Sequence, residues 1–239
     1  NNFVLLVDSS GSMSGVMNLV KQSLNILVDN LSPNDKISII RYSNEAQTLC
    51  DGENKSSKIT SAINKLVASG GTNGEAGLKQ AYEVCKKNYI EGGNNRVIFI
   101  SDGDFNIGYN NEISLEAYIK TQASSGIYLT TIGAGIGNYR DSMMETLAKN
   151  GNGTYAYLDN IYEAKKIFGD DIDKNLVTVA KDVKSGIIFN ADVVDSYRLI
   201  GYENKQMTKE EFDDESKDAG EIGSGHTSII CYELTLKDV

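Results

Sequence analysis

The start of the chain places a group of polar residues directly after a buried strand. Residues 3–7, with the sequence FVLLV, are all apolar, a run typical of a strand that is buried on both faces of a parallel sheet. The sequence Asp8-Ser9-Ser10-Gly11-Ser12 follows, and a helical pattern comes next. Open α/β sheets bind ligands beyond the carboxyl ends of their strands. The segment therefore predicts an α/β fold with a binding site at residues 8–12.

The side chains of residues 8–12 supply hard oxygen atoms in a tight turn. Asp8 contributes a carboxylate, Ser10 and Ser12 contribute neutral hydroxyl groups, and Gly11 allows the chain to turn sharply. Such oxygens suit a hard divalent cation, and a set too small to fill an octahedron suits Mg²⁺ that keeps some bound water. Taken alone, these residues also fit a polar turn that only caps the following helix.

Three segments together resemble the metal-ion-dependent adhesion site of von Willebrand factor type A domains. They are Asp8-Ser9-Ser10-Gly11-Ser12, Ser69-Gly70-Gly71-Thr72-Asn73 and Ile100-Ser101-Asp102-Gly103-Asp104. The resemblance implies metal ligands at Asp8, Ser10, Ser12, Thr72 and Asp102, with Mg²⁺ as the ion and Mn²⁺ or Ca²⁺ as alternatives. Capping of the following helix is the alternative role of Thr72, and Asn73 could serve it as well. Asp104 is a further carboxylate, but in the resembling family the first Asp of such a pair is the ligand.

The resemblance also implies how the site works. Five protein ligands cannot all bind directly and still leave positions for a partner, so some act through water. In the receptive arrangement Thr72 binds directly and Asp102 acts through water, which leaves the ion more electrophilic. A carboxylate from an Asp or Glu of a protein partner then fills the open position. We therefore expect a metal-dependent binding module.

Two other functions compete with binding. An open Mg²⁺ site could assist hydrolysis or phosphoryl transfer, and a metal could also serve only to hold the loops together. An enzyme is less favoured because no His or Lys neighbours the site in sequence, and the single histidine, His226, lies in the C-terminal segment. We expect no catalytic residues.

Alternating strand and helix patterns predict the architecture of the first domain, residues 1–176. Strand patterns occupy residues 3–7, 36–43, 47–50, 96–100, 127–132 and 154–158, and helical patterns occupy residues 16–31, 57–67, 76–85, 112–124, 143–148 and 161–176. This order predicts a doubly wound, mostly parallel Rossmann-like sheet with helices on both faces. Residues 47–50 are expected to add one antiparallel strand at the edge.

The sequence Gly133-Ala134-Gly135-Ile136-Gly137 follows one of these strands and could be mistaken for a dinucleotide-binding loop. Its glycines are spaced Gly-x-Gly-x-Gly rather than Gly-x-Gly-x-x-Gly, and it follows a late strand. We expect a sharp strand-to-helix turn and no nucleotide.

Residues 177–239 are expected to form a β-rich appendage. Strand patterns occupy residues 179–184, 187–194, 197–202 and 227–236, and the acidic residues 209–221 predict a solvated loop. Residues 196–204 and 218–227 resemble the C-terminal region of bacterial proteins labelled calcium-activated chloride channel homologues. That group is typically exported and lipid-anchored, which implies an extracytoplasmic, membrane-anchored full-length protein. A sheet this small is marginal alone, so we expect it to pack on the first domain or to self-associate.

Charge and composition exclude several partners. The 23 Lys and Arg residues against 33 Asp and Glu residues give a net charge of −10, which disfavours nucleic acid. No apolar run is long enough to span a membrane. The chain begins at its first core strand, which suggests that an upstream targeting segment has been removed. Its three cysteines indicate neither a disulfide framework nor a zinc site, and at least two are expected to be buried.

Overall fold

The chain folds into two compact units. A computed structural model describes residues 1–239 apart from residues 104–111, 136–140, 171, 173–175, 177, 202–205, 215–218, 226 and 238–239. The first unit is Asn1–Val177 and the second is Thr178–Val239. The expected boundary, between residues 176 and 177, lies next to this division.

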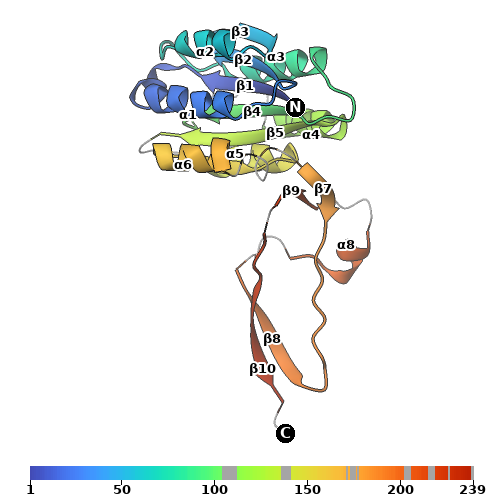
Figure 1. Cartoon of the computed structure of the whole chain (residues 1–239). Coiled ribbons are helices and arrows are strands. Elements are labelled where there is room, and N and C mark those ends of the chain that lie inside the picture. Colours follow the sequence, from blue (N-terminus) through green and yellow to red (C-terminus); the bar gives the residue numbers. More distant parts are fainter. Residues whose placement is uncertain are drawn as a thin grey trace. The chain divides into compact units, whose positions relative to one another are not determined.

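The first unit is built on a six-stranded sheet with the strand order β3-β2-β1-β4-β5-β6 (Figure 1). Its strands are β1 (Asn2–Asp8), β2 (Lys36–Tyr42), β3 (Ala46–Glu53), β4 (Asn95–Ser101), β5 (Ile127–Ala134) and β6 (Tyr155–Leu158). All neighbouring strands pair in parallel except β3, which runs antiparallel to β2 at the edge. The predicted mostly parallel sheet with one antiparallel edge strand is confirmed.

Helices cover both faces of this sheet. They are α1 (Met17–Asp29), α2 (Ser56–Asn64), α3 (Gly74–Lys87), α4 (Glu112–Ser124), α5 (Asp141–Asn150) and α6 (Ile161–Lys165). A 3₁₀ turn, η1 (Gly11–Gly15), precedes α1, and a π-helical turn, η2 (Lys166–Asp170), follows α6. Apolar side chains of α1, α2 and α6 form the core on one face, and those of α3, α4 and α5 form the core on the other.

Strand β1 lies at the centre and feeds both cores. Phe3, Leu5 and Val7 point to the core of α1 and α2, whereas Val4 and Leu6 point to the core of α3 and α4. Every residue of β1 is buried. This explains the uninterrupted apolar run, because successive side chains of a strand point to opposite faces and both faces are covered.

The second unit contains two small antiparallel sheets. Strand β7 (Thr178–Val183) pairs with β9 (Gly220–Gly223), and β8 (Val194–Ile200) pairs with β10 (Cys231–Leu236). A short helix, α8, spans Lys209–Asp213. The β-rich character expected of this region is confirmed.

Two local predictions in the second unit are wrong, and the strand expected at residues 227–236 begins only at Cys231. The expected strand at residues 187–194 begins only at Val194, because the carbonyl oxygen of Asn190 accepts the backbone N–H groups of Val193 and Val194 in a turn. The expected solvated loop at residues 209–221 contains α8. That helix forms because Thr208 and Glu211 each accept the other's backbone N–H in a capping box.

Candidate metal centre

The carboxylate of Asp8 is held at the end of β1 by hydrogen bonds from three residues. Its Oδ1 accepts the backbone N–H of Ser10 at 2.8 Å. Its Oδ2 accepts the hydroxyl groups of Tyr42, at 2.9 Å, and of Ser101, at 3.0 Å. Tyr42 ends β2 and Ser101 ends β4, the two strands that flank β1 in the sheet. The sheet order therefore fixes the orientation of this buried carboxylate.

Burial is the largest influence on the acidity of Asp8. It raises the pKa of the carboxyl group, and the hydrogen bonds from Ser10, Tyr42 and Ser101 act in the opposite direction. Burial, together with the nearby charge of Asp8, raises the pKa of Tyr42 well above its usual value. Tyr42 consequently stays protonated and remains a hydrogen-bond donor. A cation beside Asp8 would favour the ionised carboxylate.

The two serines of the first loop bring neutral oxygens together. The hydroxyl oxygens of Ser10 and Ser12 are 3.0 Å apart. Ser10 is buried and Ser12 is exposed, so the pair runs from Asp8 toward solvent. The backbone N–H of Met13 donates to the carbonyl oxygen of Ser10, and the side chain of Met13 is buried below η1. This anchor fixes the turn that carries both hydroxyl groups.

The second loop, residues 69–73, is attached to the first by two backbone hydrogen bonds. The N–H of Gly11 donates to the carbonyl oxygen of Gly70 at 3.0 Å, and the N–H of Ser69 donates to that of Ser9 at 2.7 Å. Gly70 has a φ of +85°, a conformation that favours glycine. Thr72, half-buried, follows two residues later. The structure therefore brings the predicted second segment against the first.

The end of the second loop is held by the segment that follows β2. The side-chain oxygen of Asn44 accepts the N–H of Gly71 at 2.9 Å, and the N–H of Asn73 donates to the carbonyl oxygen of Ser43 at 2.6 Å. Asn73 is the N-cap of α3, because its side chain accepts the N–H of Ala76. Of the two capping candidates, Asn73 is the one that caps α3. The hydroxyl group of Thr72 is therefore not needed as a cap.

The third segment, residues 100–104, contacts the site through Ser101, the residue before Asp102. Ser101 bonds to Asp8, and its oxygen also accepts the N–H of Gly103 at 3.1 Å. Asp102, half-buried, lies between them. A Cβ placed on Gly135, just after β5, would lie 3.3 Å from the Cβ of Asp102. Gly135 thus gives Asp102 its space. Asp104 lies outside the described residues, as do Ile136 and Gly137.

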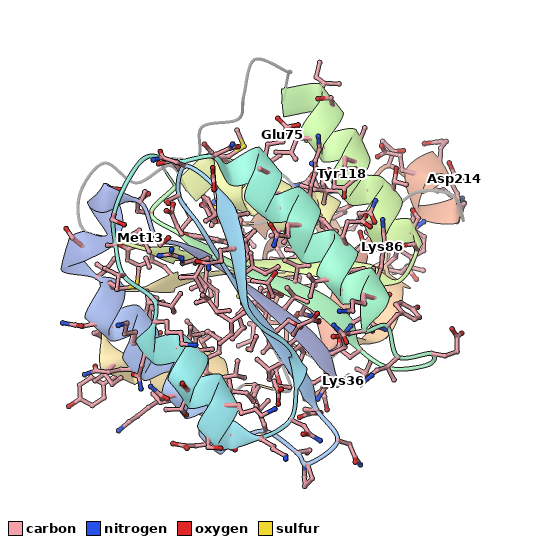
Figure 2. The ribbon with its side chains drawn as sticks, turned by 90° about the horizontal axis from the view of Figure 1, so that it is seen from above. Met13, Lys36, Glu75, Lys86, Tyr118 and Asp214 are labelled. Atoms are coloured by element: carbon pink, nitrogen blue, oxygen red, sulfur yellow. The ribbon has the colours of Figure 1, made fainter. Side chains whose placement is uncertain are left out.

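These loops lie at one end of the first unit. In Figure 2, Met13 of η1 and Glu75 in the first turn of α3 lie toward one end, and Lys36 at the start of β2 and Lys86 in the last turn of α3 lie toward the other. The end with Met13 is the one where β1, β2 and β4 finish. The candidate site is therefore at the carboxyl ends of the parallel strands, where such sheets bind ligands.

Four residues of the site were not predicted from the sequence. Tyr42, Ser101, Asn44 and Gly135 position Asp8, the second loop and Asp102. Ser101 could have been found from its place before Asp102, at the end of an apolar strand. Tyr42 carried a comparable signal as a hydroxyl-bearing residue that ends the strand next to β1.

The chemistry of the donors fits a hard cation with few protein ligands. The predicted set offers carboxylate and hydroxyl oxygens, which Mg²⁺ prefers. Within the described ranges, no three His, Cys, Asp or Glu side chains form a group that could hold a metal ion. Both lone pairs of Asp8 Oδ2 are taken by Tyr42 and Ser101. Asp8 would therefore contact an ion through Oδ1 or through water.

Comparison with known sequences identifies the first unit. Residues 3–104 match the sequence model of the von Willebrand factor type A domain. The chain contains a von Willebrand factor type A domain. Residues 174–239 match a second model, described as the C-terminal region of uncharacterized protein YfbK. The more specific expectation, membership of the calcium-activated chloride channel homologue group, stays a prediction.

The type A domain is followed by the same C-terminal region in a homologue. The chain is 42% identical over 240 residues to "Uncharacterized protein YfbK" of Escherichia coli (strain K12), an alignment that covers 99% of this chain and 42% of that protein. The chain thus spans less than half of this curated relative's length.

Two solved structures share the fold of the type A domain. "von Willebrand factor type A from Catenulispora acidiphila" has a TM-score of 0.64 and 18% identity, and covers 76% of this chain and 44% of that one. An "aerotolerance-related membrane protein" from Bacteroides fragilis NCTC 9343 has a TM-score of 0.56 and 21% identity, and the match covers 72% of this chain and 98% of that one.

Proposed function

We propose that the type A domain is a protein-binding module that uses a divalent cation to hold a carboxylate of its partner. The proposed ligands are Asp8, Ser10, Ser12, Thr72 and Asp102, and the proposed ion is Mg²⁺. The observation that carries the proposal is the joining of three loops around one buried carboxylate, through the contacts of Asp8 with Ser101 and of Gly11 with Gly70. The likeness to type A domains supports a role in protein interaction.

The proposed ligands contribute both negative charge and neutral oxygen atoms. Asp8 supplies a buried negative charge, and Ser10, Ser12 and Thr72 supply neutral hydroxyl oxygens. A bound Mg²⁺ supplies an electropositive centre that accepts an anionic oxygen. Asp102 and the partner's carboxylate compete to balance the remaining charge. A partner would be received with Thr72 as a direct ligand and with Asp102 acting through water.

The contacts of Asp8 favour binding over catalysis. Its hydrogen-bond partners in the described chain are hydroxyl groups and a backbone N–H, and none of these is a base near neutral pH. Hydrolysis or phosphoryl transfer needs a group that accepts or delivers a proton at the reacting atom. The proposal therefore assigns no catalytic residue.

Water-proton relaxation with Mn²⁺ tests the proposal directly. Mn²⁺ with open coordination positions enhances the relaxation of water bound to it, and a carboxylate that displaces this water lowers the enhancement. We expect Mn²⁺ to bind, acetate to lower the enhancement, acetamide to leave it unchanged, and Asp8→Ala to abolish it. Bound Mn²⁺ whose enhancement does not respond to acetate would contradict carboxylate binding. Turnover of p-nitrophenyl phosphate that is lost in Asp8→Ala would favour an enzyme.

The location of the full-length protein is a separate proposal. We propose that it displays this domain outside the cytoplasm and is anchored to a membrane; the anchoring is supported by the Bacteroides fragilis protein of similar fold, which is described as a membrane protein. No helix in the described part of this chain has both the length and the apolar composition needed to cross a bilayer. Digestion of intact cells with an added protease, followed by detection of fragments from residues 1–239, tests whether the domain is exposed outside the cell. A domain that is completely protected from the protease would contradict the proposed location.

A further inference from the structure

The hairpin of β8 and β10 has one apolar face and one mixed face, which carries charged and hydroxyl side chains together with Cys231 and Ile200. Tyr197 pairs with Leu234 and Leu199 with Tyr232, whereas Arg198 pairs with Glu233 and Ser196 with Thr235. Residues paired directly across an antiparallel sheet point to the same side, so the two kinds of pair alternate between faces. Val194 and Leu236 extend the apolar face past an irregularity in β8. This alternation is typical of a sheet that covers one of its faces.

The apolar face is incompletely covered within the described chain. Phe189 packs on it with ring centroids 4.9 Å from Tyr197 and 5.2 Å from Tyr232. Tyr197 nevertheless remains 65% exposed, and Leu236 remains 61% exposed. Among the described residues of the second unit, none is classed as buried. A two-stranded sheet with so little core is marginal by itself.

Strand β10 also has an unprotected edge. Within the described residues it pairs only with β8, so the backbone groups on its other side have no strand partner. Its single charged residue, Glu233, is occupied by Arg198, with Nη2 2.7 Å from Oε2. Edge strands are normally blunted by charges, prolines or bulges. Strand β8 carries both the charged Asp195, which is skipped in the register with β10, and the irregularity itself, so β10 is the more exposed edge for pairing.

We propose that the chain self-associates by antiparallel pairing of β10 with β10 of a second copy, centred on Leu234. In that register Leu234 faces Leu234 of the second copy, Tyr232 faces Leu236, and Glu233 faces Thr235. Apolar residues meet apolar residues on one face, and no like charges meet on the other. The two hairpins then form one four-stranded sheet related by a twofold axis.

Neighbouring registers are less favourable. The apolar faces of the two hairpins stay on the same side of the joint sheet only if the twofold axis passes through a residue of β10. The alternative registers are therefore centred on a neighbouring residue. A centre at Glu233 would place two Glu233 side chains opposite each other, which is destabilising. A centre at Thr235 would leave only residues 234–236 of each strand paired, against residues 232–236 for the proposed centre. Sequence pattern and strand length thus select Leu234.

Sedimentation velocity on the 239-residue chain tests the association. We expect a dimer whose fraction rises with protein concentration, and we expect Leu234→Lys, which places two charges at the twofold axis, to return it to monomer. The matched control is Val67→Lys, a change of an apolar side chain that is 57% exposed in the first unit, and it should leave the dimer intact. A wild-type chain that stays monomeric, or a Leu234→Lys variant that dimerises like wild type, overturns the proposal.

Disulfide trapping tests the register independently of any loss of folding. In a Cys231→Ser background, Leu234→Cys should form a covalent dimer with oxidised glutathione, because Cβ atoms directly opposite each other lie about 4.5–5.5 Å apart. Thr235→Cys in the same background faces Glu233 and should remain monomeric. Equal trapping of both variants, or trapping of Thr235→Cys alone, contradicts the proposed register. A type A domain that shows the wild-type Mn²⁺ response in both variants confirms that the first unit is folded.

Discussion

The hydroxyl group of Tyr42 donates a 2.9 Å hydrogen bond to Oδ2 of Asp8, and these two residues face each other in the parallel pairing of β1 with β2. Ser101 donates to the same oxygen from the other neighbouring strand. Oδ2 is therefore committed to the protein, and Oδ1 is the carboxylate oxygen nearer to Ser10. The central strands of the sheet thus decide which carboxylate oxygen is available to a cation.

Replacing Tyr42 with phenylalanine tests this control of Asp8. The change removes one donor to a buried carboxylate, so the pKa of Asp8 should rise further and the carboxylate should be held less firmly. Loss of a partner that orients a metal ligand typically costs at least about tenfold in metal affinity. We expect Tyr42→Phe to weaken Mn²⁺ binding by about tenfold. Isothermal titration calorimetry at pH 7 measures the change.

Tyr82→Phe is the matched control for Tyr42→Phe. Tyr82 is equally buried, and its hydroxyl oxygen has no hydrogen-bond partner among the described residues. Removing an unpaired buried hydroxyl is neutral or stabilising. The control should therefore keep its Mn²⁺ affinity and its stability. Equal losses of affinity in both variants would show that Tyr42 acts through packing and not through Asp8.

Strands and helices of the first unit were predictable because their patterns are local. The apolar run at residues 3–7 indicates β1 without any knowledge of its neighbours, and it is buried as expected. The roles of Tyr42 and Ser101 were not predictable in the same way. Each depends on the sheet order β2-β1-β4, which brings residues from distant parts of the sequence to one carboxylate. The sequence shows only that each is a hydroxyl-bearing residue at the end of a strand, and the contact with Asp8 follows only once the sheet order is known.

In the second unit, an apolar sequence pattern predicted a strand that the structure does not contain. Apolar residues at 187–189 resembled a strand, but the turn at Asn190 separates them from β8, and Phe189 packs across the hairpin instead. The expectation of at least two buried cysteines was also wrong. Cys85 is buried, Cys50 is half-buried and Cys231 is exposed. Residue type alone does not reveal exposure where a strand has no covering layer.

Thiol labelling should separate the three cysteines. Burial raises the pKa of Cys85 to about 12 and that of Cys50 to about 11, so both remain protonated thiols near neutral pH. Cys231 is exposed on β10. We expect one equivalent of iodoacetamide to react quickly with the folded chain at pH 8, and three equivalents to react after unfolding in guanidinium. Rapid labelling of Cys85 in the folded chain, seen by peptide mass spectrometry, would contradict its burial.

Divalent cations should stabilise the type A domain against heat. A cation that binds only the folded state adds about 2.7 kcal/mol at a concentration one hundred times its Kd. For a chain of this size that corresponds to a rise in Tm of about 5–10 °C. Differential scanning calorimetry with Mg²⁺ or EDTA measures the shift. Asp8→Ala should remove most of it and Asp104→Ala should keep most of it; full shifts in both variants would refute the ligand assignment.

A methyl group at position 135 should disturb the site while every proposed ligand residue stays unsubstituted. The added Cβ of Gly135→Ala would lie 3.3 Å from the Cβ and 3.8 Å from the Cα of Asp102, so Asp102 must move by a few tenths of an ångström. We expect a loss of stability of about 1 kcal/mol without metal and a several-fold loss of Mn²⁺ affinity. Gly15→Ala is the control, because a Cβ there meets nothing within 4 Å. If Gly135→Ala binds Mn²⁺ as tightly as Gly15→Ala, Asp102 either tolerates displacement or lies outside the site.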